Sequence, residues 1–167
     1  VILIVSTSFE KVINKFFRKI EKDREFFSYY NVSLEEAMQL AKEQANGYLL
    51  EAVEKLTDEC VPDVDFFDYD EELQVFNFKL TDKEIGLLTD LMREVYFERD
   101  FVTLKAFKIA MTPSDLNQFS PASERKTFTD MVNGIKSENV GKISQYASVD
   151  RITGKKKLIN YSQYNED

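Results

Sequence analysis

The acidic segment 63–72 is the first place in the sequence where residue types and spacing could support chemistry. Its carboxylates could bind a divalent cation, and they are Asp63, Asp65, Asp68, Asp70, Glu71 and Glu72. Counted from Asp63, an EF-hand loop requires an oxygen ligand fifth, a glycine sixth and a glutamate twelfth. The sequence places Phe67, Asp68 and Gln74 there. We therefore interpret the segment as a solvated acidic loop held by buried aromatic rings, and we expect no metal site.

The composition excludes most other catalytic and metal chemistry. The chain has no histidine, and therefore no imidazole base, no Ser-His-Asp triad and no histidine metal ligand. Its single cysteine, Cys60, cannot form an intrachain disulfide or a cysteine-rich zinc site, and it fits a reducing compartment. Other acids stand beside lysines at i,i+4 spacing, as Glu51 does with Lys55, which is typical of a salt-bridged helix surface. We expect no catalytic residue, no cofactor and no enzymatic activity.

The overall charge argues against broad binding to nucleic acids or membranes. The chain has 30 acidic and 22 basic residues and a formal net charge of -8. An acidic surface repels phosphate backbones and anionic lipids. The apolar start, residues 1–5, is far shorter than the roughly 20 residues of a membrane span, and it lacks the basic start of a signal peptide. We expect a cytoplasmic protein without membrane association.

Helical periodicity predicts that the first half of the chain forms two long helices. Apolar residues at helical spacing predict an amphipathic helix over 9–20 that continues toward Phe27. Ser33 and Glu36 form a capping-box sequence, which predicts a second helix over 34–58 before Pro62. Gly47 inside this helix predicts close packing at that point, because glycine otherwise destabilises a helix.

The second half of the chain predicts two further helices. Thr81 with Glu84 is another capping box and opens a helix over 81–97. The apolar pattern shifts at Arg99–Asp100, so the residues after it form either a short helix or a continuation. Residues 111–121 are predicted to be a polar loop. Ser120-Pro121 predicts the start of the last helix, which is expected to end between Asn139 and Gly141.

The residues after 141 change character. Ile143, Gln145, Ala147 and Val149 alternate, and 150–154 can form a turn, which indicates a hairpin or an extended arm. The segment Thr153-Gly154-Lys155 lacks the upstream glycine of a phosphate-binding loop and is interpreted as part of the turn. The predicted fold is mainly α: a small helical bundle over 1–141 with an extended or β-hairpin C-terminal arm over 142–167.

The arm is locally basic on an acidic protein. Lys142 and a group of residues near 151–157 supply the charge. One interpretation is a solubilising hairpin tip, and the other is docking onto an acidic partner surface. For docking, the predicted partner-binding residues are Arg151, Lys155, Lys156, Lys157, Ile159, Tyr161 and Tyr164.

Aromatic residues near the N-terminus exceed what one helix needs to bury. They are Phe9, Phe16, Phe17, Phe26, Phe27, Tyr29 and Tyr30. We expect some of these rings to lie in the core. The rest, together with an apolar strand over 1–5, are expected to form a subunit interface, because exposed aromatic patches mark such contacts.

The layout of the chain resembles the head–tail connector (adaptor, or head-completion) proteins of long-tailed phages that infect Gram-positive bacteria. The resemblance covers roughly residues 9–164 and is a pattern of helices, loops and tail. It is carried by the helix over 34–58 and by four segments: Pro62-Asp63-Val64-Asp65-Phe66-Phe67-Asp68-Tyr69-Asp70, Leu80-Thr81-Asp82-Lys83-Glu84-Ile85 leading into Leu91-Met92, Thr112-Pro113-Ser114-Asp115-Leu116, and Phe119-Ser120-Pro121. The apolar start, residues 1–5, has no place in this pattern.

The resemblance implies a structural subunit of the virion, located at the head–tail interface and assembled in the host cytoplasm. Copies would form a ring, commonly of twelve, that joins the portal protein to a tail-side connector or stopper protein. The C-terminal arm would reach a neighbouring copy or the portal. DNA would pass through the channel without specific binding, which suits an acidic chain.

Two other function classes remain open at this point. One is an intracellular acidic regulatory or interaction protein without catalytic activity, which sequesters a basic partner. The other is a metal-dependent enzyme that uses the acids of segment 63–72. Oligomeric state and metal binding separate these alternatives from the connector.

Overall fold

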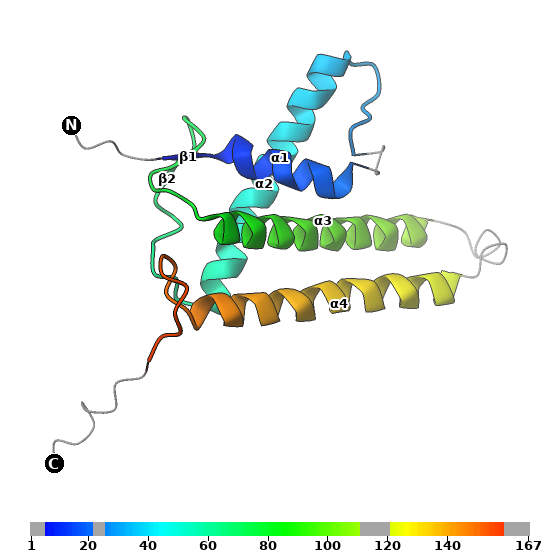
Figure 1. The fold of residues 1–167 in the computed structure, drawn as a ribbon. Coiled ribbons are helices and arrows are strands. Elements are labelled where there is room, and N and C mark those ends of the chain that lie inside the picture. Colours follow the sequence, from blue (N-terminus) through cyan, green and yellow to red (C-terminus); the bar gives the residue numbers. More distant parts are fainter. Residues whose placement is uncertain (1–5, 22–25, 111–120, 159–167) are drawn as a thin grey trace.

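The computed structural model describes residues 6–21, 26–110 and 121–158, and this part of the chain is mainly helical (Figure 1). It forms four helices, which are α1 (Phe9–Ile20), α2 (Leu34–Glu59), α3 (Asp82–Ala110) and α4 (Pro121–Ala147). Helix α3 is central, since it contacts each of the other three helices, and α4 runs antiparallel beside it. None of the helices in these ranges combines the length and apolar character needed to cross a bilayer.

Two of the helix starts are fixed by the capping boxes that the sequence predicts. At α2, the Glu36 amide donates to Ser33 Oγ at 3.2 Å, and the Ser33 amide donates to Glu36 Oε2 at 2.8 Å. At α3, Thr81 and Glu84 make the same reciprocal pair at 3.2 and 2.7 Å. Both boxes satisfy amide groups that a helix start leaves without a backbone partner. These predictions are confirmed.

A small sheet joins the N-terminal end of α1 to the loop between α2 and α3. Strands β1 (Thr7–Ser8), β2 (Tyr69–Asp70) and β3 (Val75–Phe76) pair antiparallel in the order β1-β3-β2. The Thr7 hydroxyl also accepts a hydrogen bond from the Leu80 amide at 2.9 Å. The sequence predicted only an ordered loop here, because two-residue strands carry too few side chains to show a period of two.

Most of the aromatic rings near the N-terminus lie in the core or pack against it. Phe9 and Phe16 are fully buried, and Phe16 contacts the rings of Phe17, Phe26, Tyr48 and Tyr96 at centroid distances of 6.0–6.2 Å. Phe17, Phe27 and Tyr29 are partly buried against the same cluster. Tyr30 differs from the others, with 92% of its surface exposed. Most of the rings predicted to be in excess therefore have packing partners within this chain. The predicted strand over 1–5 lies outside the described residues.

Two predicted helix ends are wrong. Helix α4 continues to Ala147, where the sequence indicated an end between Asn139 and Gly141, so it passes through the predicted boundary between bundle and arm. Ile143 shows why: it is buried on the face of α4 that packs into the core, although its alternation with Gln145 imitates a strand. Helix α1 stops at Ile20, and Phe26 and Phe27 lie in a turn.

Two further points of the helical prediction are now decided. Helix α3 continues through the shift of pattern at Arg99 as far as Ala110, so the continuation is the correct alternative. Gly47 does not mark a close approach, because a Cβ placed there would meet no atom within 4 Å. The expectation of tight packing at Gly47 is wrong. The predicted polar loop over 111–120 lies outside the described residues, and Pro121 is the first residue of α4, as predicted.

Candidate functional site

The predicted turn in the basic segment is present and is built around Asp150. The Asp150 carboxylate accepts hydrogen bonds from the amides of Ile152 and Thr153, at 3.1 and 2.7 Å, and from the Thr153 hydroxyl at 2.8 Å. Gly154 has a φ of 67°, a conformation that glycine adopts without steric cost. A single antiparallel bridge between Val149 and Lys156 closes the turn. These contacts show a minimal hairpin directly after α4.

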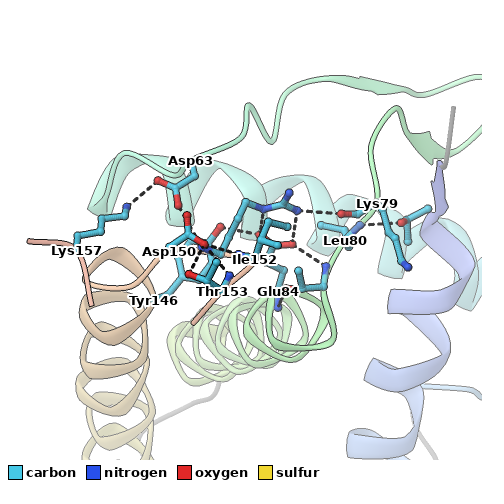
Figure 2. A network of polar contacts seen from close by, with 12 residues as sticks. Asp63, Lys79, Leu80, Glu84, Tyr146, Asp150, Ile152, Thr153 and Lys157 are labelled. Atoms are coloured by element: carbon cyan, nitrogen blue, oxygen red, sulfur yellow. Dashed lines mark hydrogen bonds and ion pairs between the residues drawn. The ribbon is translucent and has the colours of Figure 1, made fainter. Parts of the chain in front are cut away.

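Arg151 anchors this turn to Glu84 at the start of α3, and Figure 2 shows the polar network around Glu84. Its Nε donates to Glu84 Oε1 at 2.7 Å and its Nη2 donates to Glu84 Oε2 at 2.8 Å, which is the two-pronged geometry that favours arginine. Nη2 also donates to the Lys79 carbonyl at 2.9 Å. The Glu84 side chain is fully buried and that of Arg151 is 15% exposed. The interaction is therefore a buried ion pair between segments far apart in the sequence.

Glu84 has other partners in addition to Arg151. Its carboxylate accepts from the Thr81 amide in the capping box and from the Tyr146 hydroxyl of α4 at 2.8 Å. Burial by itself would raise the pKa of Glu84, but the hydrogen bonds from Arg151, Thr81 and Tyr146 outweigh it and leave that pKa below its ordinary value. Glu84 is thus held as a carboxylate, and it ties together the start of α3, the end of α4 and the turn.

The Glu84 carboxylate shifts the pKa values of two of its partners, Tyr146 and Arg151. Burial, reinforced by the hydrogen bond to Glu84, raises the pKa of the Tyr146 hydroxyl, which therefore stays protonated as a donor. The hydrogen bonds to Glu84 likewise raise the pKa of Arg151. Since every group in this network has partners and a fixed proton, its geometry is that of a structural clamp. It offers no free base or nucleophile.

The acidic segment does not converge on a point where a cation could bind. Asp63 accepts from Lys157 Nζ at 2.7 Å, and this contact lowers the pKa of Asp63. Asp65, Asp68 and Asp70 accept hydrogen bonds from Phe67 N, Asn77 Nδ2 and Leu73 N, respectively. Within the residues that the structure describes, no three acidic or sulfur-bearing side chains are placed to share a metal ion.

The predicted partner-binding residues fall into three groups. Arg151 and Lys157 are engaged in ion pairs within the chain, with Glu84 and Asp63. Lys155 and Lys156 are exposed. Ile159, Tyr161 and Tyr164 lie outside the described residues. Sequence reasoning missed the role of Tyr146 altogether, and it found Glu84 only as a helix cap, because no local pattern links either residue to Arg151.

Next to the clamp, the start of α3 and the end of α4 enclose a groove of about 510 Å³. Its wall includes the apolar side chains of Leu87 and Val149, and Lys83, Lys142 and Lys156 also line it. Lys142 is paired with Asp90 at 2.8 Å and with Glu138 at 2.6 Å. Lys83 and Lys156 are exposed and form no ion pair with another described residue. This surface, which we call the lysine groove, combines apolar side chains with three lysines and with the Asp90 carboxylate, which is paired with Lys142.

A second buried polar cluster joins α2, α3 and α4 below the groove. Asn139 Nδ2 donates to Glu94 Oε2 at 2.7 Å and to the Asp90 carbonyl at 3.2 Å, and Lys55 donates to Glu94 Oε1 at 3.0 Å. Asn139 is 2% exposed and Glu94 is 7% exposed. The cluster satisfies a carboxylate that three helices bury, and we assign it a structural role.

Replacing Asn139 with alanine tests this role. The change removes a donor from the buried Glu94 carboxylate, and a buried group left without its partner costs about 1–3 kcal/mol. We expect Asn139→Ala to lower the free energy of unfolding in urea by that amount. Asn133→Ala, at an exposed position of the same helix, is the control and should change it by less than about 0.5 kcal/mol. Equal losses in both variants would contradict the assignment.

The comparisons with known proteins found no similar protein. No family model matches the chain, and no curated protein and no solved structure has significant similarity to it. The functional argument therefore depends on the residues and their geometry.

Proposed function

We propose that this chain is a non-enzymatic structural subunit of a phage head–tail connector ring, which joins the portal to the tail and surrounds the DNA exit channel. The observation that carries the proposal is the clamp between Arg151 and Glu84. The resemblance implies a C-terminal arm that reaches a neighbouring copy or the portal, and such an arm benefits from a fixed point of departure on the helical body. The clamp fixes the chain at 151 to the central helix, directly before exposed Lys155, Lys156 and Leu158.

Two further features support the proposal. The helical body is held by an apolar core and one buried ion pair, and its described residues place no three acidic or sulfur-bearing side chains around a common metal position. The formal net charge of -8 suits a channel through which DNA passes without adhering, because an acidic surface repels the phosphate backbone. The burial of the N-terminal rings removes one argument for self-association, so the subunit contact must use other surfaces.

The proposal is tested by electron microscopy and light scattering on the purified chain, alone and with its portal protein. We expect ring-shaped particles, either alone or on the portal, with a mass equal to a multiple of 19.5 kDa for the ring. A chain that stays monomeric in both samples and does not bind the portal would overturn the proposal.

The second candidate is an acidic interaction protein that binds a basic partner as a monomer. The packing of Phe16 and its neighbours favours it, since six of the seven N-terminal rings are satisfied within one chain. This candidate predicts a stable monomer that retains a basic partner and ignores the portal. The same light-scattering experiment therefore separates the two functions.

A further inference from the structure

The β2–β3 hairpin presents a short acidic tip with one apolar side chain. Glu71, Glu72, Leu73 and Gln74 form the turn, and all four are exposed. The Asp70 carboxylate accepts from the Leu73 amide at 2.9 Å, and Gln74 adopts a φ of 52°, so the shape of the tip is defined by its own backbone. Leu73 is 72% exposed, which leaves an aliphatic side chain in water next to Glu71 and Glu72.

The tip and the lysine groove have complementary properties. The groove offers the apolar Leu87 and Val149 with Lys83 and Lys156 on its rim, and neither lysine has an acidic partner among the described residues. The tip offers an apolar side chain flanked by two free carboxylates. Burial of a leucine side chain is favourable by about 1.5–3 kcal/mol. Opposite charges at the rim fix the orientation of such a contact and exclude wrong partners.

One chain cannot easily bring these two surfaces together. The hairpin pairs with β1 at the beginning of α1, on the α1 side of the central helix α3. The groove is lined by residues from the start of α3, the end of α4 and the turn after it. Helix α4 packs on the side of α3 away from α1 (Figure 1). Two different patches of one subunit that bind each other form a head-to-tail contact, and such contacts generate rings when the rotation closes.

We propose that the acidic tip 71–74 of one copy docks into the lysine groove of the next copy, with Leu73 against Leu87 and Val149 and with Glu71 and Glu72 beside Lys83 and Lys156. This inference rests on the proposed ring function and names the surfaces that build the ring. The occupant of the groove is a second copy of this chain.

Charge reversal tests the contact. We expect Lys83→Glu with Lys156→Glu to weaken self-association at least tenfold, because like charges then face each other across the contact. Glu71→Lys with Glu72→Lys should have the same effect. All four changes in one chain should restore assembly, since the charges are again complementary. Lys79→Glu with Lys126→Glu is the matched control, because both lysines are exposed outside the groove, so the net charge changes equally and assembly should be unchanged.

Crosslinking provides a second measurement that does not depend on charge. In a Cys60→Ser background, Leu73→Cys with Val149→Cys should give a ladder of disulfide-linked oligomers on oxidation, because each copy carries both halves of the contact. Tyr30→Cys with Val149→Cys is the control, since Tyr30 is exposed away from the tip, and it should give no ladder.

The outcomes separate the contact from the function. Loss of assembly with rescue, together with the ladder, supports the docking. Rings that persist in every variant and show no ladder would overturn the docking while the connector function stands. A wild-type chain that is monomeric with and without the portal would overturn both.

Discussion

Replacing Arg151 with methionine is expected to lower the free energy of unfolding by about 3 kcal/mol, because it leaves the buried Glu84 carboxylate without its cation. Glu84 would keep its hydrogen bonds from Thr81 and Tyr146, which places the loss at the lower end of the range for broken buried pairs. Urea denaturation followed by circular dichroism measures it. Lys155→Met, in the same turn but exposed, is the control and should change stability by less than about 0.5 kcal/mol.

A double-mutant cycle distinguishes the ion pair from simple loss of packing. Methionine preserves much of the arginine stem, so Arg151→Met in a Glu84→Gln background should cost much less than in the wild type, since no buried charge is left behind. If Arg151→Met costs the same in both backgrounds, the pair contributes nothing specific and the clamp is wrongly assigned.

The clamp also predicts how stability depends on pH. The pKa of Glu84 lies below its ordinary value of 4.5, so the folded chain binds this proton more weakly than the unfolded chain does. The contribution of Glu84 to stability is therefore fully present above about pH 4.5 and is lost as the pH falls through the depressed folded-state pKa. Asp90 and Glu98 act in the same direction, because lysine contacts outweigh burial and lower their pKa values. Arg151→Met should flatten the acid side of this profile.

Replacing Phe16 with alanine is expected to cost about 3–5 kcal/mol, the range for deleting a buried aromatic ring. Phe16 is fully buried and contacts four other rings, so its removal leaves a cavity that several elements border. Tyr30→Ala is the matched control at an exposed ring and should be nearly neutral. Thermal unfolding of both variants measures the difference.

The Phe16→Ala variant also tests whether the N-terminal aromatic rings take part in assembly. If the N-terminal aromatic cluster is core, Phe16→Ala lowers stability while the variant, where folded, still assembles as the wild type does. A fully stable Phe16→Ala variant that has lost assembly would show that the ring serves an interface, contrary to the packing described above.

Helix starts were predictable from sequence because their chemistry is local. In each capping box, both partners lie within three residues, and the hydrogen bonds that form are the ones the spacing predicts. The helical class of the fold follows from the same periodic patterns. The sequence left open whether α3 continues past Arg99, because the apolar pattern changes phase near that residue.

The end of α4 was mispredicted because one of the buried residues on its core-facing side is polar. The stripe of buried residues on α4 runs through Val132, Ile135, Asn139 and Ile143 at spacings of three and four. Asn139 is polar, so the apolar pattern stops there in the sequence, while the helix continues because Glu94 satisfies the side chain. Glu94 belongs to another helix, so the local periodicity of the sequence does not reveal this pairing.

The candidate site was the least predictable part of the molecule. Arg151 was singled out as a surface residue for a partner, whereas the fold places its side chain against Glu84, 67 positions earlier. Neither residue carries a local signal of the other. The lysine groove is equally non-local, because Lys83 and Lys156 meet only after α4 has packed along α3.

The separation of Glu84 from Arg151 has a consequence for the chain as it is made. Glu84 leaves the ribosome 67 residues ahead of Arg151, which at roughly 5–20 residues per second is about 3–13 s. During that interval, the nascent chain has the start of α3 but not yet Arg151, the residue that pairs with the Glu84 carboxylate. The order of synthesis therefore means that the Glu84 site near the start of α3 is completed only after α4 and the turn at 150–154 have been made.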